Sequence, residues 1–131
     1  MTRAYAQLIR GVIATQEKRY ADALDAFRAG TSLADLWLLR FYQGRAYLEA
    51  GKFVEAMDEF QICHERRGEA ASIFLDEKPT WRYLATLPYW MGRAQEMMGM
   101  TDVAKENFIA YVATRPEGGP FVDDARERVG K

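Results

Sequence analysis

The 131-residue sequence contains one cysteine, one histidine and no long hydrophobic run. A single cysteine, Cys63, excludes an internal disulfide framework and any cysteine-based zinc or iron–sulfur site within one chain. The longest apolar candidate, 33–41, contains Asp35 and Arg40 and falls well short of the roughly 18 residues that a membrane span needs. The first ten residues carry two arginines and lack the apolar core of a signal peptide. We therefore expect a cytoplasmic protein with no membrane-spanning segment.

A strong charge of one sign is also missing. The chain has 18 basic and 19 acidic residues, which gives a formal net charge of −1. A balance this even argues against a nucleic-acid-binding protein and against binding to an acidic membrane surface. Hydrophobic residues make up 49% of the sequence and charged residues 28%, which are ordinary values for globular proteins. The length suits one domain, so we expect a single domain over residues 1–131.

Strand signals are weak, and helical periodicity takes their place. Hydrophobic alternation is never sustained, and no Asn-Gly or Asp-Gly turn separates apolar runs. Tyr20, Ala23, Leu24 and Phe27 instead follow the i, i+3, i+4, i+7 spacing of one helix face, and later segments repeat this spacing. Glycines and the segment 116–120 interrupt the pattern. The sequence therefore predicts seven helices and an all-α fold without a sheet.

One residue pattern recurs three times along the chain. Two aromatic residues, any residue and then Gly-Arg-Ala occur at 41–46 and again at 89–94. A motif glycine is followed by an alanine twelve residues later and a phenylalanine sixteen residues later; the sets are Gly11, Ala23 and Phe27, then Gly44, Ala56 and Phe60, then Gly92, Ala104 and Phe108. Each unit is therefore predicted to be a helix with a small residue, a turn and a second helix. The small residue would allow the two helices to approach closely.

This arrangement resembles the tetratricopeptide repeat (TPR) family, whose motif of about 34 residues contains the same glycine, alanine and phenylalanine. The repeats are degenerate, because the family's tryptophan and leucine are absent from all three. The resemblance implies a right-handed stack of three helix-turn-helix units at about 4–33, 37–68 and 85–116. It also implies a capping helix at about 120–129, which covers the apolar face that a terminal repeat leaves open.

An insert separates the second and third repeats. The first two motif glycines are 33 residues apart and the next two are 48 apart, which leaves about 14 extra residues near 69–84. One interpretation is that the insert lengthens the second helix of the middle repeat, turns back through 76–79 and fills a gap by packing Trp81, Tyr83 and Leu84 against the repeats. The other is a lid or partner patch around Trp81 and Tyr83. The residues at 76–84 read Asp-Glu-Lys-Pro-Thr-Trp-Arg-Tyr-Leu and precede a helix with Gly-Arg-Ala. This segment resembles the helical-repeat tails of bacterial multidomain signalling proteins such as serine/threonine kinases.

The sequence contains no catalytic constellation. No serine lies in a Gly-x-Ser-x-Gly motif, and no glycine-rich phosphate-binding loop occurs. Cys63 and His64 are adjacent, so on a helix they point about 100° apart and not toward each other. Cys63 also falls where the repeat has a small buried residue, so we expect it in the core. One histidine and one cysteine without a carboxylate cluster do not make a zinc site. We therefore expect no enzyme activity, no catalytic residue, no metal site and no cofactor.

The TPR resemblance implies a concave groove that is lined by the first helix of every repeat. Carried onto this sequence, the groove residues are Leu8, Val12, Phe41, Arg45, Leu48, Tyr89, Arg93 and Met97. An arginine fork holds a carboxylate or phosphate bidentately, so Arg45 and Arg93 predict a peptide ligand with an acidic group. The alternative is that each arginine pairs with an acid on its own helix, Glu49 or Glu96. The asparagines with which some family members clamp chaperone tails are absent, because Val12 and Arg45 occupy those positions.

The expected function is a protein–protein interaction module that binds a peptide or partner protein in this groove. A second hypothesis is a regulatory or dimerisation segment of a larger bacterial signalling protein, of the kinase or cyclase type, acting in cis. A third is a small-ligand sensor in which the insert closes over the groove. Tyr5, Leu8 and Ile9 give the first helix an apolar face, which favours a homodimer as a further expectation.

Overall fold

The computed structural model describes residues 2–70 and 81–130, and the side chains of Thr2, Trp81 and Arg82 lie outside that description. The described residues form nine helices and no strand. The helices are α1 (Thr2–Gln16), α2 (Tyr20–Leu33), α3 (Trp37–Glu49), α4 (Phe53–Glu65), α5 (Arg67–Ala70), α6 (Trp81–Leu84), α7 (Leu87–Met97), α8 (Thr101–Ala113) and α9 (Val122–Val129). The seven longer ones are those that the periodicity predicts, and the short α5 and α6 lie at the two ends of the insert.

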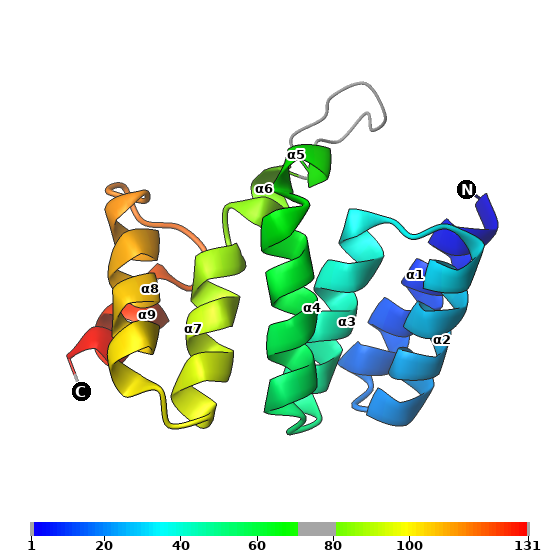
Figure 1. The fold of residues 1–131 in the computed structure, drawn as a ribbon, viewed down its shortest axis with the longest axis horizontal. Helices are drawn as coiled ribbons and strands as arrows, with labels where there is room; N and C mark the ends of the chain where they lie inside the picture. Colours follow the sequence, from blue (N-terminus) through cyan, green and yellow to red (C-terminus); the bar gives the residue numbers. More distant parts are fainter. Residues whose placement is uncertain (1, 71–80, 131) are drawn as a thin grey trace.

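The helices stand side by side as a stack of antiparallel pairs. Figure 1 shows α1 and α2 at one end, α3 and α4 in the middle, and α7 and α8 followed by α9 at the other end, with the two termini far apart. Each pair packs extensively within itself, and α9 packs on α8. This arrangement confirms the all-α helical-repeat fold that the three-fold pattern predicts.

A glycine and a phenylalanine fix the spacing within each helix pair. A Cβ atom built on the motif glycine would lie within 3 Å of the phenylalanine ring sixteen residues later in all three repeats: 2.2 Å for Gly11 and Phe27, 2.6 Å for Gly44 and Phe60, and 2.7 Å for Gly92 and Phe108. All three rings are completely buried. The glycine thus gives the ring the room in which it packs, as the sequence pattern predicts.

The turns inside the three pairs share one backbone conformation. Gly51 and Gly99 have φ near +81°, and each stands two residues before the second helix of its pair. Lys18 occupies the equivalent place in the first pair and has φ of 62°. The left-handed region is open to glycine but is sterically costly for a residue with a Cβ atom. The first turn therefore carries backbone strain that the other two turns avoid.

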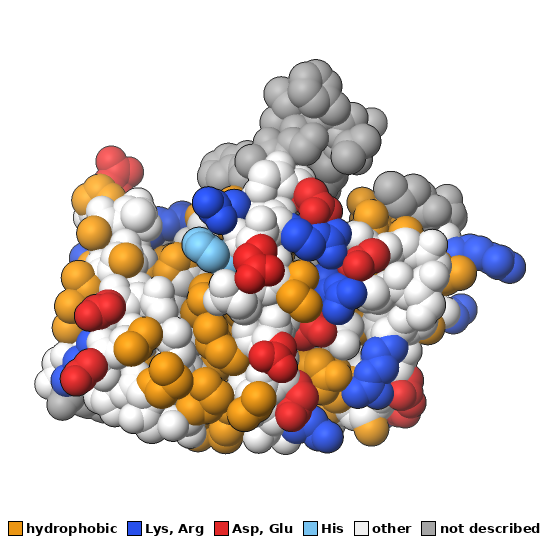
Figure 2. All heavy atoms as spheres, in the orientation of Figure 1, with side chains coloured by type: hydrophobic (Ala, Val, Ile, Leu, Met, Phe, Trp, Pro, Cys, Tyr) orange, Lys and Arg blue, Asp and Glu red, His pale blue; other side chains and the backbone are white. Residues whose placement is uncertain are grey.

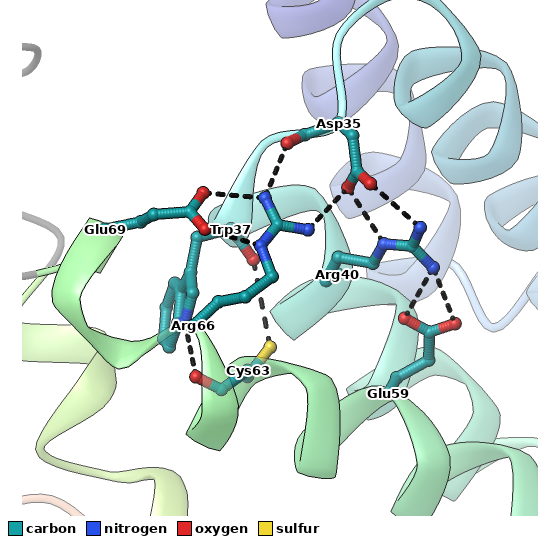
Figure 3. A network of polar contacts seen from close by, with 7 residues as sticks. All are labelled: Asp35, Trp37, Arg40, Glu59, Cys63, Arg66 and Glu69. Carbon is teal, nitrogen blue, oxygen red and sulfur yellow. Dashed lines mark hydrogen bonds and ion pairs between the residues drawn. The ribbon is translucent and has the colours of Figure 1, made fainter.

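An ion-pair network joins the middle repeat to the connection that precedes it, between α2 and α3, and to the start of the insert (Figure 3). Arg40 of α3 donates to Asp35 over 2.9 Å and to Glu59 of α4 over 3.3 Å. Arg66, at the end of α4, donates to Asp35 over 3.0 Å and to Glu69 of α5 over 2.6 Å. The two arginines hold the pKa of the Asp35 carboxyl at about 2. Burial raises the pKa of Glu59.

A second contact fastens the two helices of the middle repeat beside this network. The Trp37 indole donates from Nε1 to the carbonyl oxygen of Cys63 over 2.8 Å, and both side chains are buried. Cys63 therefore lies in the core, as its place in the repeat predicts. Helix α4 ends at Glu65, and the chain turns into α5 instead of continuing the same helix. The expectation of a lengthened second helix is therefore wrong.

The end of the insert returns to the stack. Tyr83 packs against Phe41 and Tyr42 of α3, with 5.9 Å between ring centres in each pair. Leu84 is half-buried against the core. These contacts are those expected of an insert that packs its aromatic residues on the repeats. The turn expected at 76–79 and the side chain of Trp81 lie outside the described residues.

The face seen in Figure 2 carries both apolar and charged side chains. Hydrophobic side chains gather over α4, α7 and α8, whereas acidic and basic side chains lie among one another over the middle of the molecule. Several large apolar residues are exposed there or elsewhere on the described surface, including Val54, Met97, Met100, Val103 and Ile109.

Candidate functional site

The eight residues predicted to line the groove differ in how much surface they offer. Leu8 of α1, Phe41 and Leu48 of α3 and Tyr89 of α7 are buried, with exposed fractions of 7% or less. The other four keep accessible surface: Val12, Arg45, Arg93 and Met97. Buried residues support a binding surface from beneath, so the chemistry available to a ligand is concentrated on the two arginines.

Arg45 is a cation held by aromatic faces. Its guanidinium carbon lies 4.1 Å from the centre of the Trp90 ring of α7. The rings of Phe41 and Tyr42 lie 5.9 and 5.6 Å away. Burial lowers the pKa of Arg45, and no acidic residue in the described part of the chain forms an ion pair with it. The aromatic rings therefore orient the positive charge of Arg45, which has no ion-pair partner among the described residues.

Arg93 is engaged differently. Its guanidinium donates to the Tyr89 hydroxyl over 3.1 Å, and that hydroxyl donates to Asp124 of α9 over 2.6 Å. Burial and the Asp124 carboxylate raise the pKa of Tyr89, and Arg93 opposes that shift. The Trp90 ring centre lies 5.9 Å from the Arg93 guanidinium. The structure therefore brings Arg45 and Arg93 to one indole ring, although part of the donor capacity of Arg93 is already used.

The alternative ion pairs within single helices are not formed among the described residues. Arg45 and Glu49 interact only over a longer distance, through their charges. Glu96 instead pairs with Arg128 of α9, which also donates to Asp124 over 2.6 Å. Helix α9 is thus bound to α7 by polar contacts and packs on α8.

A pocket of about 380 Å³ opens beside Arg45. It is lined by Arg45, Tyr83, Thr86, Trp90, Arg115, Pro120 and Phe121. These residues come from α3, α6, the start of α7 and the connection between α8 and α9. No acidic residue is among them, so the described lining is aromatic and positively charged. A pocket of this size and composition fits one side chain of a ligand and its neighbouring backbone.

Sequence reasoning misses Thr86, Arg115, Pro120 and Phe121 as pocket residues. Arg115 and Pro120 border a Pro- and Gly-rich segment that reads as a linker turn, and no local pattern shows where that turn passes. Phe121 has the left-handed φ of 65° just before α9. Its ring stacks on Tyr89 at 4.8 Å and meets Trp90 edge-on at 5.0 Å. These contacts hold a bulky residue in a backbone conformation that it rarely adopts.

Other chemistry is sparse in the described part of the chain. No group of three or more metal-ligating side chains occurs among the described residues. Burial raises the pKa of the Cys63 thiol to about 12, so at neutral pH it stays protonated and is a poor nucleophile. None of the described helices has the length and apolar character to cross a bilayer.

No family model and no curated protein matches this chain. Among solved structures, the chain is similar to the second TPR domain of human RPAP3, determined by NMR in complex with the HSP70 peptide SGPTIEEVD. The TM-score is 0.73 at 21% sequence identity, and the alignment covers 99% of this chain and 97% of that chain. The fold is that of a TPR domain. In the TPR fold α1, α3 and α7 are the first helices of the three repeats, and α9 takes the place of a capping helix.

Proposed function

We propose that this chain is a non-catalytic peptide-binding module. The peptide lies along the first helices α1, α3 and α7 and presents an acidic group to Arg45, with Arg93 beside it on the same Trp90 ring. The observation that supports this most directly is the Arg45 guanidinium, which is stacked on Trp90 and has no ion pair with any described residue. A partly desolvated cation gains from an incoming carboxylate more than a fully hydrated one does, because less water must be displaced.

The remaining groove residues fit the same proposal. Val12 and Met97 have accessible surface on α1 and α7, where they offer apolar contacts on either side of the arginines. Buried Phe41, Leu48 and Tyr89 hold the helices that carry these contacts. The RPAP3 domain of the same fold binds a peptide with several acidic residues. That likeness supports a peptide as the class of ligand and does not identify the partner of this chain.

The test is a positional-scanning array of nine-residue peptides, in which each position is fixed in turn as each amino acid. Wild type is compared with Arg45→Gln, Arg93→Gln and, as a control, Arg3→Gln. Arg3 is an exposed arginine on α1 at the far end of the stack from α9 (Figure 1). Circular dichroism first establishes that every variant is folded.

The proposal expects wild type to select peptides with an acid fixed at one position. Arg45→Gln is expected to lose that selection by about tenfold or more, the scale of one charge-assisted hydrogen bond, and Arg3→Gln to keep it. Absence of any peptide binding by wild type would overturn the proposal. Stabilisation in a thermal-shift screen by metabolites and by no peptide would instead favour the small-ligand sensor.

A further inference from the structure

We infer that the connection between α8 and α9 supplies one wall of the peptide-binding pocket, in which Arg115 and Arg45 together hold a carboxylate of the peptide. This inference rests on the proposed function and names the second cation of its binding site. The sequence predicts Arg93 for that role. The pocket geometry assigns the role to Arg115.

Two arginines from distant parts of the chain line the same pocket. Arg45 comes from the middle of α3, and Arg115 follows the end of α8. Neither forms an ion pair with a described residue, and no acid is among the residues that line the pocket. Two positive charges on the wall of one pocket both attract an anion that enters it. The pocket is therefore built for a negatively charged group.

Arg93 is less suited to this role. It donates to Tyr89, which is in turn bound to Asp124 of α9, so a negative charge already faces it from the neighbouring helix. Arg115 has no such contact. Its guanidinium lies 5.8 Å from the Tyr111 ring centre, a second aromatic face that orients a cation without neutralising it.

The connection is held in place by specific contacts. The Tyr111 hydroxyl donates to the carbonyl oxygen of Pro120. Phe121, with its left-handed backbone, stacks on Tyr89 and meets Trp90, so its ring forms one wall of the pocket. Strained backbone conformations cluster at binding sites. They persist because the surrounding packing holds them, and they keep the site preformed. A preformed wall costs the ligand no ordering on binding.

A carboxylate suits this lining better than a bare inorganic anion. The arginine forks match its two oxygens, and the aromatic rings of Trp90 and Phe121 can pack against the carbon atoms that carry it. Arg115 also lines a neighbouring pocket of about 420 Å³ with Leu84, Ala85, Pro88 and Thr114. An extended peptide can thus place its acid between the arginines and an adjacent residue in this second pocket.

The experiment uses the strongest acid-containing peptide from the array, synthesised in three forms. These are the free peptide, the same peptide with its C-terminus amidated, and the same peptide with its acidic side chain replaced by the amide. Affinities are measured by fluorescence anisotropy for wild type, Arg115→Gln, Phe121→Ala and a control, Arg126→Gln. Arg126 is an exposed arginine of α9 whose nearest acid is Asp123 of the same helix, at 3.9 Å.

We expect Arg115→Gln to weaken binding of the free peptide by about tenfold or more and Arg126→Gln to leave it unchanged. The loss should disappear for the one peptide form that lacks the bound carboxylate, because a double-mutant cycle removes both partners of the same contact. If the loss disappears for the amidated peptide, the pocket holds the C-terminal carboxylate. If it disappears for the peptide with the side-chain amide, the pocket holds the side-chain carboxylate. Phe121→Ala should weaken all three forms, since its ring contacts the peptide and not only the acid.

The experiment distinguishes failure of this inference from failure of the proposed function. If Arg45→Gln loses the peptide while folded Arg115→Gln binds it as wild type does, the role of Arg115 is overturned and the groove function stands. If wild type selects peptides without preference for an acid, the carboxylate assignment is overturned. If wild type binds no peptide at all, both proposals fall together.

Discussion

The guanidinium carbon of Arg45 lies 4.1 Å from the centre of the Trp90 ring, and this contact spans two repeats. Helices α3 and α7 otherwise touch little, because α7 packs mainly on α8 and its main neighbour in the middle repeat is α4. The cation–π contact therefore links the first helices of the second and third repeats at the point where the insert interrupts their regular spacing. It sets the orientation of the residue on which both proposals depend.

Replacement of a motif glycine should disturb the packing of its helix pair. In Gly44→Ala the new Cβ atom would lie 2.6 Å from the Phe60 ring, so the buried ring must move. We expect a loss of about 1–3 kcal/mol in the free energy of unfolding, the usual cost of overpacking, reduced by the higher helix propensity of alanine. Urea denaturation followed by circular dichroism measures this difference.

The matched control is Gly68→Ala in α5. No described atom lies within 4 Å of a Cβ at this position, and its φ is not in the left-handed region. The variant should be as stable as wild type or more stable by up to about 1 kcal/mol. Equal effects at Gly44 and Gly68 would show that the contact with Phe60 does not determine the spacing.

The turn of the first repeat should be improved by a glycine. Lys18 has φ of 62°, whereas Gly51 and Gly99 take this conformation without a Cβ atom. We expect Lys18→Gly to raise the melting temperature, because relief of a left-handed residue gains about 1 kcal/mol. The reciprocal variant Gly51→Lys should lower it. A fall in melting temperature for Lys18→Gly, measured by calorimetry, would contradict the strain argument.

The contribution of Asp35 to the free energy of unfolding should disappear at low pH. Its pKa is about 2 in the folded protein, below the ordinary value of 3.8, chiefly because Arg40 donates to it. A depressed folded pKa gives stability that is present above the unfolded value and is lost as pH falls from about 4 to about 2. The side chain is 46% exposed, so solvent screening limits the effect to roughly 1 kcal/mol.

Urea unfolding at a series of pH values tests this pH dependence, with wild type compared with Asp35→Asn. The two proteins should differ at pH 7 and at pH 5 and should converge as the pH approaches 2. Asp25→Asn serves as the control, because Asp25 pairs only with exposed Arg28 of its own helix at 3.8 Å. A difference between wild type and Asp35→Asn that persists at pH 2 would mean that the carboxylate charge is not what Arg40 and Arg66 stabilise.

The hydroxyl of Tyr89 should fasten the capping helix. It donates to Asp124 over 2.6 Å and accepts from Arg93, while its ring stacks on Phe121. Tyr89→Phe keeps the ring and removes both hydrogen bonds, so we expect a loss of about 1–2 kcal/mol that is concentrated in α9. Amide hydrogen exchange should become faster in α9 and stay unchanged in α2. Tyr5→Phe, at an exposed position on α1, is the control.

Much of the fold was accessible from the sequence because its signals are local or strictly periodic. Helix periodicity depends on residues three and four apart, and the contacts of Gly44 with Phe60 and of Gly92 with Phe108 repeat at one offset. The short helices α5 and α6 were not predicted. Their segment lacks periodicity, and α5 is joined to the repeats by Asp35 and Arg66, which are far apart in the sequence.

The candidate site was harder to predict from the sequence than the fold, because its positions were carried over from a family motif that these repeats match only in part. Phe41 and Tyr89 are large aromatic residues and are buried, one under Tyr83 from the insert and the other under Phe121. Neither covering residue belongs to the repeat pattern. The motif therefore names positions on the first helices but cannot show what else packs on them.

The sequence by itself determined the seven longer helices, the phase of the three repeats and the position of Arg45 on the first helix of the middle repeat. These follow from short-range spacing, which any segment carries regardless of its neighbours. Only the tertiary structure decided that Arg115 and Phe121 stand beside Arg45 and Trp90. That juxtaposition depends on the path of the chain after α8, and the path is set by contacts of Tyr111 and Tyr89 with residues beyond their own helices.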